Sequence, residues 1–204
     1  TLPILGCEKP YFYRNKIEFS FSETRWLTPE EIASKETIDS RNGLGFHIAG
    51  AWDKVLDIHK CLLQQDPSNA IRNTLKAYVL SQGYTFYNPR THTGWLRTIM
   101  IRITSLGELM VVIQFLEEQQ HEREQLLDYL LAQFPQITSL QYIINNKPND
   151  TIYDQEVICY HGRDFIYEQM EGLRFKINAK SFFQTNSTQA YELYKVTSDF
   201  AALT

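Results

Sequence analysis

Hydrophobic and polar residues alternate near the start of the chain. Between Tyr11 and Ser22, Ile17, Phe19 and Phe21 fall on one face, and charged or small polar residues fall on the other. A period of two residues is typical of a half-buried strand, so we predict a long antiparallel strand over residues 11–22. The polar stretch 28–42, which ends in an Asn-Gly turn signal, is interpreted as a loop.

The rest of the pattern predicts two hairpins, further strands and three helices. The two hairpins are expected from strands 44–48 and 55–58 and from strands 95–104 and 109–116. Further strands are expected at 139–145 and as short pieces within 156–178. The helices are expected from Ser68 to a stop at Gly83, from the charged segment 117–124 to Phe134, and over 186–202. This order indicates an α+β fold, with a mixed, mostly antiparallel sheet and helices packed on one side. Strictly alternating β-α units are missing, so no complete doubly wound cofactor domain is expected.

The overall charge restricts how the chain could bind nucleic acid. The formal net charge is -4 across 204 residues, which argues against binding by charge alone. A local site is still indicated where Tyr13, Arg14 and Lys16 combine aromatic and basic side chains, a mixture suited to stacking on single-stranded bases beside phosphates. An ordinary amphipathic strand explains the same residues nearly as well.

Two arginines interrupt an apolar strand pattern at positions 97 and 102. A buried or half-buried arginine normally has an anionic or carbonyl partner. Five residues apart on a regular strand, Arg97 and Arg102 are expected to face opposite sides. One could contact an RNA phosphate and the other a carboxylate, with Asp57 or Glu18 as candidates. Two structural ion pairs are an equally good alternative.

Two further features could bind small groups. Phe182 and Gln184 lie just before the last predicted helix, where free backbone N–H groups can hold a ligand. Alternatively, Gln184 bonds the backbone near the helix start, and Phe182 and Phe183 fill the core. Cys61 is either a metal ligand or a small buried residue. The three cysteines are widely spaced, and no signal segment or membrane-length apolar run is found, so we expect a reducing, cytoplasmic location and no membrane partner.

Taken together, these segments resemble one family along almost the whole chain: the RumA/TrmA-like RNA (uracil-5-)-methyltransferases. The residues that carry the resemblance are 12–19 (FYRNKIEF), 44–47 (LGFH) with Trp52 and 57–61 (DIHKC), 92–97 (HTGWLR), 139–140 with Asn145, and 181–186 (SFFQTN). Their order and spacing are more specific than any one of them.

The resemblance implies transfer of a methyl group from S-adenosylmethionine to C5 of a flipped-out uridine, most closely in 23S rRNA, with tRNA as the alternative target. It implies that Gln184, with Phe182 beside it, helps to bind S-adenosylmethionine. With RNA as the substrate, we expect Tyr13, Arg14, Lys16 and Arg97 to contact it, from the residue chemistry described above. It also matches Cys61 to the fourth ligand of a [4Fe-4S] cluster found in many members.

The same resemblance implies an internal fragment. Residues 1–173 would form the central α+β domain, and residues 174–204 would begin the α/β S-adenosylmethionine-binding catalytic domain. The catalytic cysteine would lie outside the chain, so neither Cys7 nor Cys159 is taken as the nucleophile, and no catalytic residue is expected here. The other cluster cysteines would also be absent. The isolated chain is therefore expected to be inactive and free of iron; a complete, non-catalytic RNA-binding module is the rival interpretation.

Overall fold

The computed structural model describes residues 3–34, 37–38 and 40–202. Its main feature is a seven-stranded sheet in the order β3-β2-β1-β4-β5-β6-β7. The strands span Lys16–Ser22 (β1), Gly43–Ile48 (β2), Ala51–Asp57 (β3), Leu96–Ile103 (β4), Leu109–Phe115 (β5), Ser139–Ile144 (β6) and Ile158–Gly162 (β7). Neighbouring strands pair antiparallel except β5 and β6, which are parallel. The predicted mixed, mostly antiparallel sheet is confirmed.

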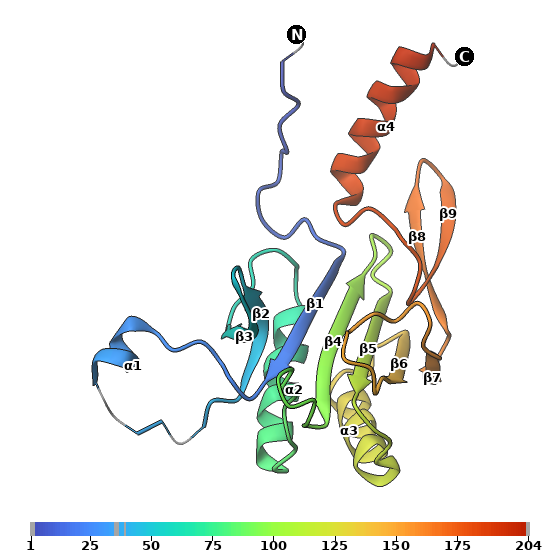
Figure 1. Cartoon of the computed structure of the whole chain (residues 1–204). Coiled ribbons are helices and arrows are strands. Elements are labelled where there is room, and N and C mark those ends of the chain that lie inside the picture. Colours follow the sequence, from blue (N-terminus) through green and yellow to red (C-terminus); the bar gives the residue numbers. More distant parts are fainter. Residues whose placement is uncertain (1–2, 35–36, 39, 203–204) are drawn as a thin grey trace.

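Helices α2 (Ser68–Ser81) and α3 (Gln120–Gln133) cover one face of this sheet, which we call the helix face (Figure 1). In α2 the apolar residues Ile71, Leu75 and Val79 recur every four positions and are fully buried, as an amphipathic helix requires. Helix α3 connects β5 to β6, which is how two parallel strands can be neighbours. The helices pack on one side, as predicted.

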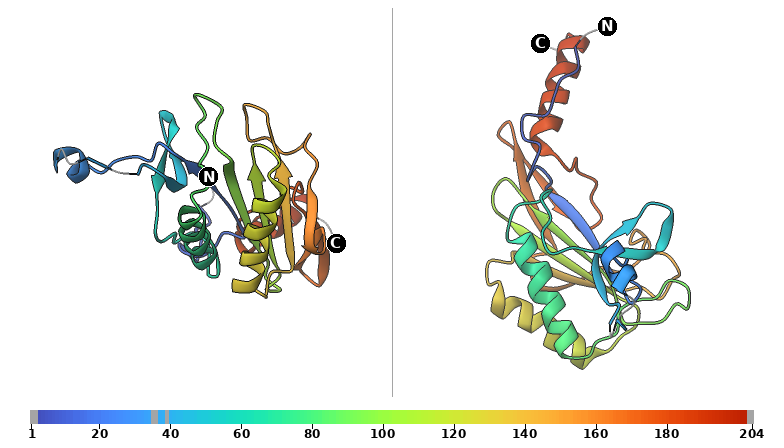
Figure 2. Two further views of the ribbon diagram at one scale, coloured as in Figure 1. Left: turned by 90° about the horizontal axis from the view of Figure 1, so that it is seen from below. Right: turned by 90° about the vertical axis from the view of Figure 1, so that its left-hand side faces the viewer.

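A separate two-stranded ribbon, β8 (Phe165–Met170) and β9 (Leu173–Asn178), covers part of the opposite face. Ile166 and Ile177 pack there against Met100, Met110 and other buried residues of the central strands. We call this the ribbon face. Helix α4 (Ser187–Ala201) follows the ribbon and projects beyond the end of the sheet, on the same side as the N-terminal segment (Figures 1 and 2).

Two predicted boundaries are wrong. Strand β1 begins at Lys16 and not at Tyr11, because the backbone N–H groups of Phe12 and Arg14 donate to the carbonyls of Leu62 and Leu63 outside the sheet. The expected loop 28–42 contains a short helix, α1 (Pro29–Ser34), although residues 35, 36 and 39 lie outside the described part of the chain.

The start of α1 is a capping box, a motif that was readable in the sequence. The backbone N–H of Glu31 donates to the hydroxyl of Thr28 at 3.3 Å, and the carboxylate of Glu31 accepts from the backbone N–H of Thr28 at 2.8 Å. Threonine followed three residues later by glutamate satisfies two free N–H groups reciprocally. The polar composition of the stretch hid this signal.

The predicted domain boundary between residues 173 and 174 falls inside the structure at the first residue of β9. The ribbon that contains it packs through Ile166 and Ile177 on the central sheet. The division into a central domain and the beginning of a catalytic domain stays a prediction.

Candidate functional site

Two segments that are far apart in the sequence meet at the start of α4. The side-chain Nδ2 of Asn15 donates to Ser187 Oγ, 172 residues away, at 2.7 Å and to the carbonyl oxygen of Gln184 at 2.8 Å. The backbone N–H of Asn15 also donates to the carbonyl of Thr185 at 2.7 Å. The predicted RNA-contacting segment around Arg14 and the predicted cofactor segment around Gln184 are therefore neighbours.

A cleft of about 570 Å³ opens beside this contact; we call it the junction cleft. The N-terminal segment, the β4–β5 turn, β8 and the first turns of α4 line it, and they contribute Tyr13, Arg14, Asn15, Ser105, Glu168, Asn186, Ser187 and Gln189 among others. The Oδ1 atom of Asn15 is buried and has no hydrogen-bond partner among the described residues. A buried acceptor of this kind has capacity for a donor group on a bound molecule.

Glu168 is a second residue of the junction cleft that the sequence did not single out. Its carboxylate accepts from the backbone N–H of Ser105 at 3.0 Å, from the hydroxyl of Ser105, and from Ser187 Oγ at 3.3 Å. The residue is only 1% exposed. It ties the β4–β5 turn, the ribbon and α4 together, so it supports the cleft walls. A charged residue at an inward position of a strand, between Ile166 and Met170, was the available signal.

Gln184 and Phe182 lie at the surface beside this junction. Phe182 is 79% exposed, whereas Phe183 packs against the buried cluster of the ribbon face. The alternative in which both aromatic residues fill the core is therefore wrong for Phe182 and confirmed for Phe183. The side-chain amide of Gln184 is exposed and makes no hydrogen bond within the described residues, whereas the helix is capped by Asn186, which accepts from the backbone N–H of Gln189 at 3.0 Å. Gln184 also lines a second hollow of about 380 Å³ along α4. Donors and acceptors thus remain available to a ligand here, and the cofactor role of both residues stays a prediction.

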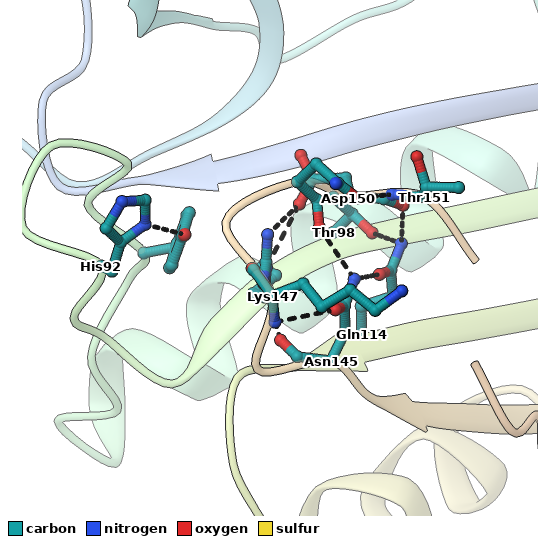
Figure 3. Close-up of polar contacts among 10 residues, drawn as sticks. His92, Thr98, Gln114, Asn145, Lys147, Asp150 and Thr151 are labelled. Carbon is teal, nitrogen blue, oxygen red and sulfur yellow. Dashed lines mark hydrogen bonds and ion pairs between the residues drawn. The ribbon is translucent and has the colours of Figure 1, made fainter. Parts of the chain in front are cut away.

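Arg97 lies at the other end of β4 from the junction cleft and is engaged by the protein itself. Three of its partners, Asn145, Lys147 and Asp150, are labelled in Figure 3. Its Nε and Nη2 donate to Asp150 Oδ1 at 3.1 and 2.6 Å, and its Nη1 donates to the carbonyls of Asn145 and Lys147, each at 2.6 Å. The guanidinium also lies 4.3 Å above the ring of Tyr87, and burial raises the pKa of that phenol. Arg97 therefore holds the loop after β6 against the sheet.

The expectation that Arg97 and Arg102 face opposite sides is wrong because β4 contains a bulge. Leu96 pairs with Phe115 and Thr98 with Gln114, so Arg97 is an extra residue in the ladder. An extra residue shifts the alternation by one. Both arginines consequently lie on the ribbon face, where the Nη2 of Arg102 donates to the carbonyl of Ser181 at 2.6 Å.

The candidate carboxylate partners were also wrong. Asp57 pairs with Lys76 and Glu18 with Lys16, both at 2.5 Å, whereas the ion pair of Arg97 is with Asp150. Burial lowers the pKa of Arg102, which has no ion pair among the described residues, although the nearby charge of Glu18 opposes this.

The structure does not bring Arg97 together with Arg14 and Lys16. Lys16 is opposite Arg102 in the β1–β4 ladder, and Arg97 lies five residues further along the strand, or roughly 16 Å. Arg97 lines a separate hollow of about 520 Å³ together with Trp52 and Tyr87. The side chain of Arg97 is 0% exposed, and this burial does not favour a contact with RNA. The RNA contact of Arg97 stays a prediction.

Cys61 is buried beside the junction segment. Asn69 fixes its backbone on both sides, because Asn69 Oδ1 accepts from the Cys61 N–H at 2.7 Å and Asn69 Nδ2 donates to the Cys61 carbonyl at 3.1 Å. Within the described residues, no three His, Cys, Asp or Glu side chains gather in a way that could hold a metal. A [4Fe-4S] cluster needs four thiolate ligands. Cys7 is exposed and lines the junction cleft, where its sulfur accepts from Nδ2 of Asn186 at 3.4 Å, and Cys159 is exposed on β7. The described residues alone do not fit such a cluster, and the ligand role of Cys61 stays a prediction.

None of the described helices is long and apolar enough to cross a membrane.

Comparison with known proteins gives relatives along nearly the whole chain. An uncharacterized RNA methyltransferase of Bacteroides thetaiotaomicron is 54% identical over 205 residues, covering 99% of this chain and 45% of the relative. A second, from Porphyromonas gingivalis, is 53% identical over 207 residues, covering 99% and 44%. No protein-family model matches. The chain thus spans a little under half the length of these relatives.

A solved structure shows the same fold. The Pyrococcus abyssi tRNA (uracil-54, C5)-methyltransferase, in complex with S-adenosyl-L-homocysteine, aligns with a TM-score of 0.67 at 25% identity, covering 94% of this chain and 42% of that one. The fold described above is therefore that of part of an S-adenosylmethionine-dependent methyltransferase. The chain is thus similar, over nearly its whole length, to part of several RNA methyltransferases.

Proposed function

We propose that the chain is the central part of an enzyme that uses S-adenosylmethionine to methylate C5 of a uridine in RNA. The observation that carries this proposal is the contact of Asn15 with Gln184 and Ser187, because it joins the RNA-contacting segment to the cofactor segment at one cleft. The likeness to a uracil-C5 methyltransferase structure supports the same chemistry.

In this proposal each segment of the junction has a distinct role. Arg14 and Lys16 neutralise phosphates, and Tyr13, which lines the junction cleft, offers a ring on which a base can stack. Gln184 hydrogen-bonds S-adenosylmethionine, and Phe182 shields it from water. When bound, that cofactor supplies the electrophilic methyl group.

The target base must leave its stack to reach the cleft, as enzymes that modify bases require. The nucleophilic cysteine and the base that removes the C5 proton belong, in our proposal, to parts of a longer protein outside this chain. Cys7 lines the junction cleft, where its sulfur accepts from Nδ2 of Asn186, but we assign neither Cys7 nor Cys159 to catalysis. The isolated chain is accordingly proposed to be inactive.

The RNA class is a finer proposal. We favour 23S rRNA, because the sequence segments are closer to the RumA type than to the TrmA type. The alternative, tRNA, is favoured by one observation: the aligned solved structure is a tRNA methyltransferase. Parallel assays on both RNAs separate the two.

Replacing Gln184 with alanine in the longer protein is expected to raise the KM for S-adenosylmethionine about tenfold, the effect of losing one hydrogen bond of roughly 1.4 kcal/mol. Steady-state kinetics with labelled cofactor measure this. Gln82→Ala is the matched control, since Gln82 is an exposed glutamine at the end of α2. An unchanged KM in Gln184→Ala would remove this residue from the cofactor site.

A further inference from the structure

The outer face of the β8–β9 ribbon carries a layer of cations over aromatic rings. Arg174 lies 4.1 Å from the ring centroid of Tyr167, and Lys176 lies 4.1 Å from that of Phe165. Arg163 lies 5.0 Å from the ring centroid of Phe165 and 5.6 Å from that of Tyr167. We call these five residues the ribbon patch. Strand alternation places them opposite Ile166 and Ile177, which are buried against the sheet.

The ribbon patch has more positive than negative charge. Arg163 pairs with Glu108 at 2.7 Å, whereas Arg174 and Lys176 have no ion pair among the described residues. Both side chains are exposed. On a chain with a net charge of -4, a face with three cations around one carboxylate is a local exception. Clustered cations of this kind are the electrostatic footprint of a phosphate-rich partner.

We propose that the ribbon patch binds single-stranded RNA that flanks the methylated nucleotide. This inference rests on the proposed function and extends it to a second contact surface, separate from Tyr13, Arg14 and Lys16. The guanidinium of Arg174 and the ammonium of Lys176 contact phosphates, while the rings beneath them hold both cations in place. A guanidinium stacked on a ring can also receive a nucleobase on its outer side.

The position of β8 connects this surface to the junction cleft. Glu168 on the inner side of β8 lines the cleft, and its neighbour Tyr167 belongs to the ribbon patch on the outer side. The cleft and the ribbon patch therefore lie on opposite sides of β8, and in this proposal RNA whose target base occupies the cleft passes round this strand to reach the patch. The buried contacts of Ile166 and Ile177 keep the ribbon fixed on the sheet, so the patch is formed before RNA arrives.

The surface favours RNA over a protein partner because its outermost groups are cations. An interface with a folded protein depends on a desolvated apolar centre, and the two rings here are covered by charged groups. Phosphates, in contrast, match unpaired Arg174 and Lys176 directly.

The test is RNA binding by the longer protein, using a fluorescently labelled 20-nucleotide single-stranded RNA and the duplex of the same sequence across a salt series. In Arg174→Gln/Lys176→Gln, loss of two phosphate contacts should lower the affinity for the single strand about 10- to 30-fold at ~0.1 M salt and reduce the slope of log K against log salt by about 1.4. The duplex should be affected less. Thermal melting verifies that the variant remains folded.

Lys54→Gln/Lys60→Gln is the matched control, because it removes the same charge from β3 and the following turn, at the opposite edge of the sheet order from β7. We expect the control to bind within threefold of the wild type. Equal affinity and slope in the ribbon variant and the wild type, or an equal loss in the control, would overturn the ribbon proposal. Methyl transfer by the wild type, measured in parallel, tests the proposed function separately: methylation with an unaffected ribbon variant rejects only the ribbon patch.

Discussion

Replacing Arg97 with methionine should lower the free energy of unfolding by about 3 to 5 kcal/mol, the range for removing one partner of a buried ion pair. The substitution would leave the carbonyls of Asn145 and Lys147 without the donor that now satisfies both. It would also remove the partner of Asp150. Because the carboxylate of Asp150 is partly exposed, water can solvate it, and the loss of unfolding free energy stays within this range. Urea unfolding of the 204-residue chain measures the difference.

The matched control is Lys195→Met, which removes another cation that pairs with a carboxylate, that of Glu192, at 2.7 Å. The side chains of Lys195 and Glu192 are 46% and 39% exposed, so water replaces the contact on both sides and the unfolding midpoint should stay close to that of the wild type. Equal stability of Arg97→Met and the wild type would contradict the assignment of Arg97 as the anchor of the loop after β6.

Gly94→Ala should be comparably severe, at about 3 to 5 kcal/mol, or should prevent folding. A Cβ at this position would lie 2.0 Å from the carbonyl oxygen of Phe86 and 2.9 Å from Cα of Tyr87, both in the backbone. Backbone atoms cannot rotate away, and a φ of +94° adds strain for any residue with a Cβ. Because this contact sets the entry into β4, the bulge at Arg97 should be disturbed as well.

Gly107→Ala separates the effect of the backbone clash from the effect of the positive φ. Gly107 also has a positive φ, of +77°, but a Cβ there would meet nothing within 4 Å. Only the conformational cost of about 1 to 2 kcal/mol should remain. If thermal or urea unfolding gave the same loss for both alanine variants, close approach of the 86–87 backbone to Gly94 would not be the reason for a glycine at that position.

The helices and most strands could be predicted because their signals are local. Ile71, Leu75 and Val79 recur at helical spacing, and α2 buries all three. The runs rich in isoleucine and valine in β4 and β5 likewise predicted a central hairpin, and both strands are buried throughout, including the polar positions within them. The last helix, predicted over 186–202, spans Ser187–Ala201 and is capped by Asn186.

The misses have physical reasons that a local pattern does not contain. Residues 11–15 were included in the predicted strand, yet the backbone N–H groups of Phe12, Arg14 and Asn15 donate to the carbonyls of Leu62, Leu63 and Thr185 and not to a strand of the sheet. The bulge at Arg97 changes the side on which a side chain lies without changing the apolar pattern. Asn15 and Ser187 are 172 residues apart in the sequence, and only the folded structure brings them into contact. The sequence pattern therefore identified both segments but could not predict that they meet.

The most direct test of the central claim is release of tritium from RNA that carries tritium at C5 of uridine. Methylation replaces the hydrogen at C5, so each methyl group transferred must release one tritium ion into water. The longer protein is incubated with S-adenosylmethionine and unmodified rRNA or tRNA transcripts in separate reactions. We predict cofactor-dependent release from one RNA class, with rRNA expected; firm binding of both RNAs without release from either would contradict the account and support a non-catalytic RNA-binding module.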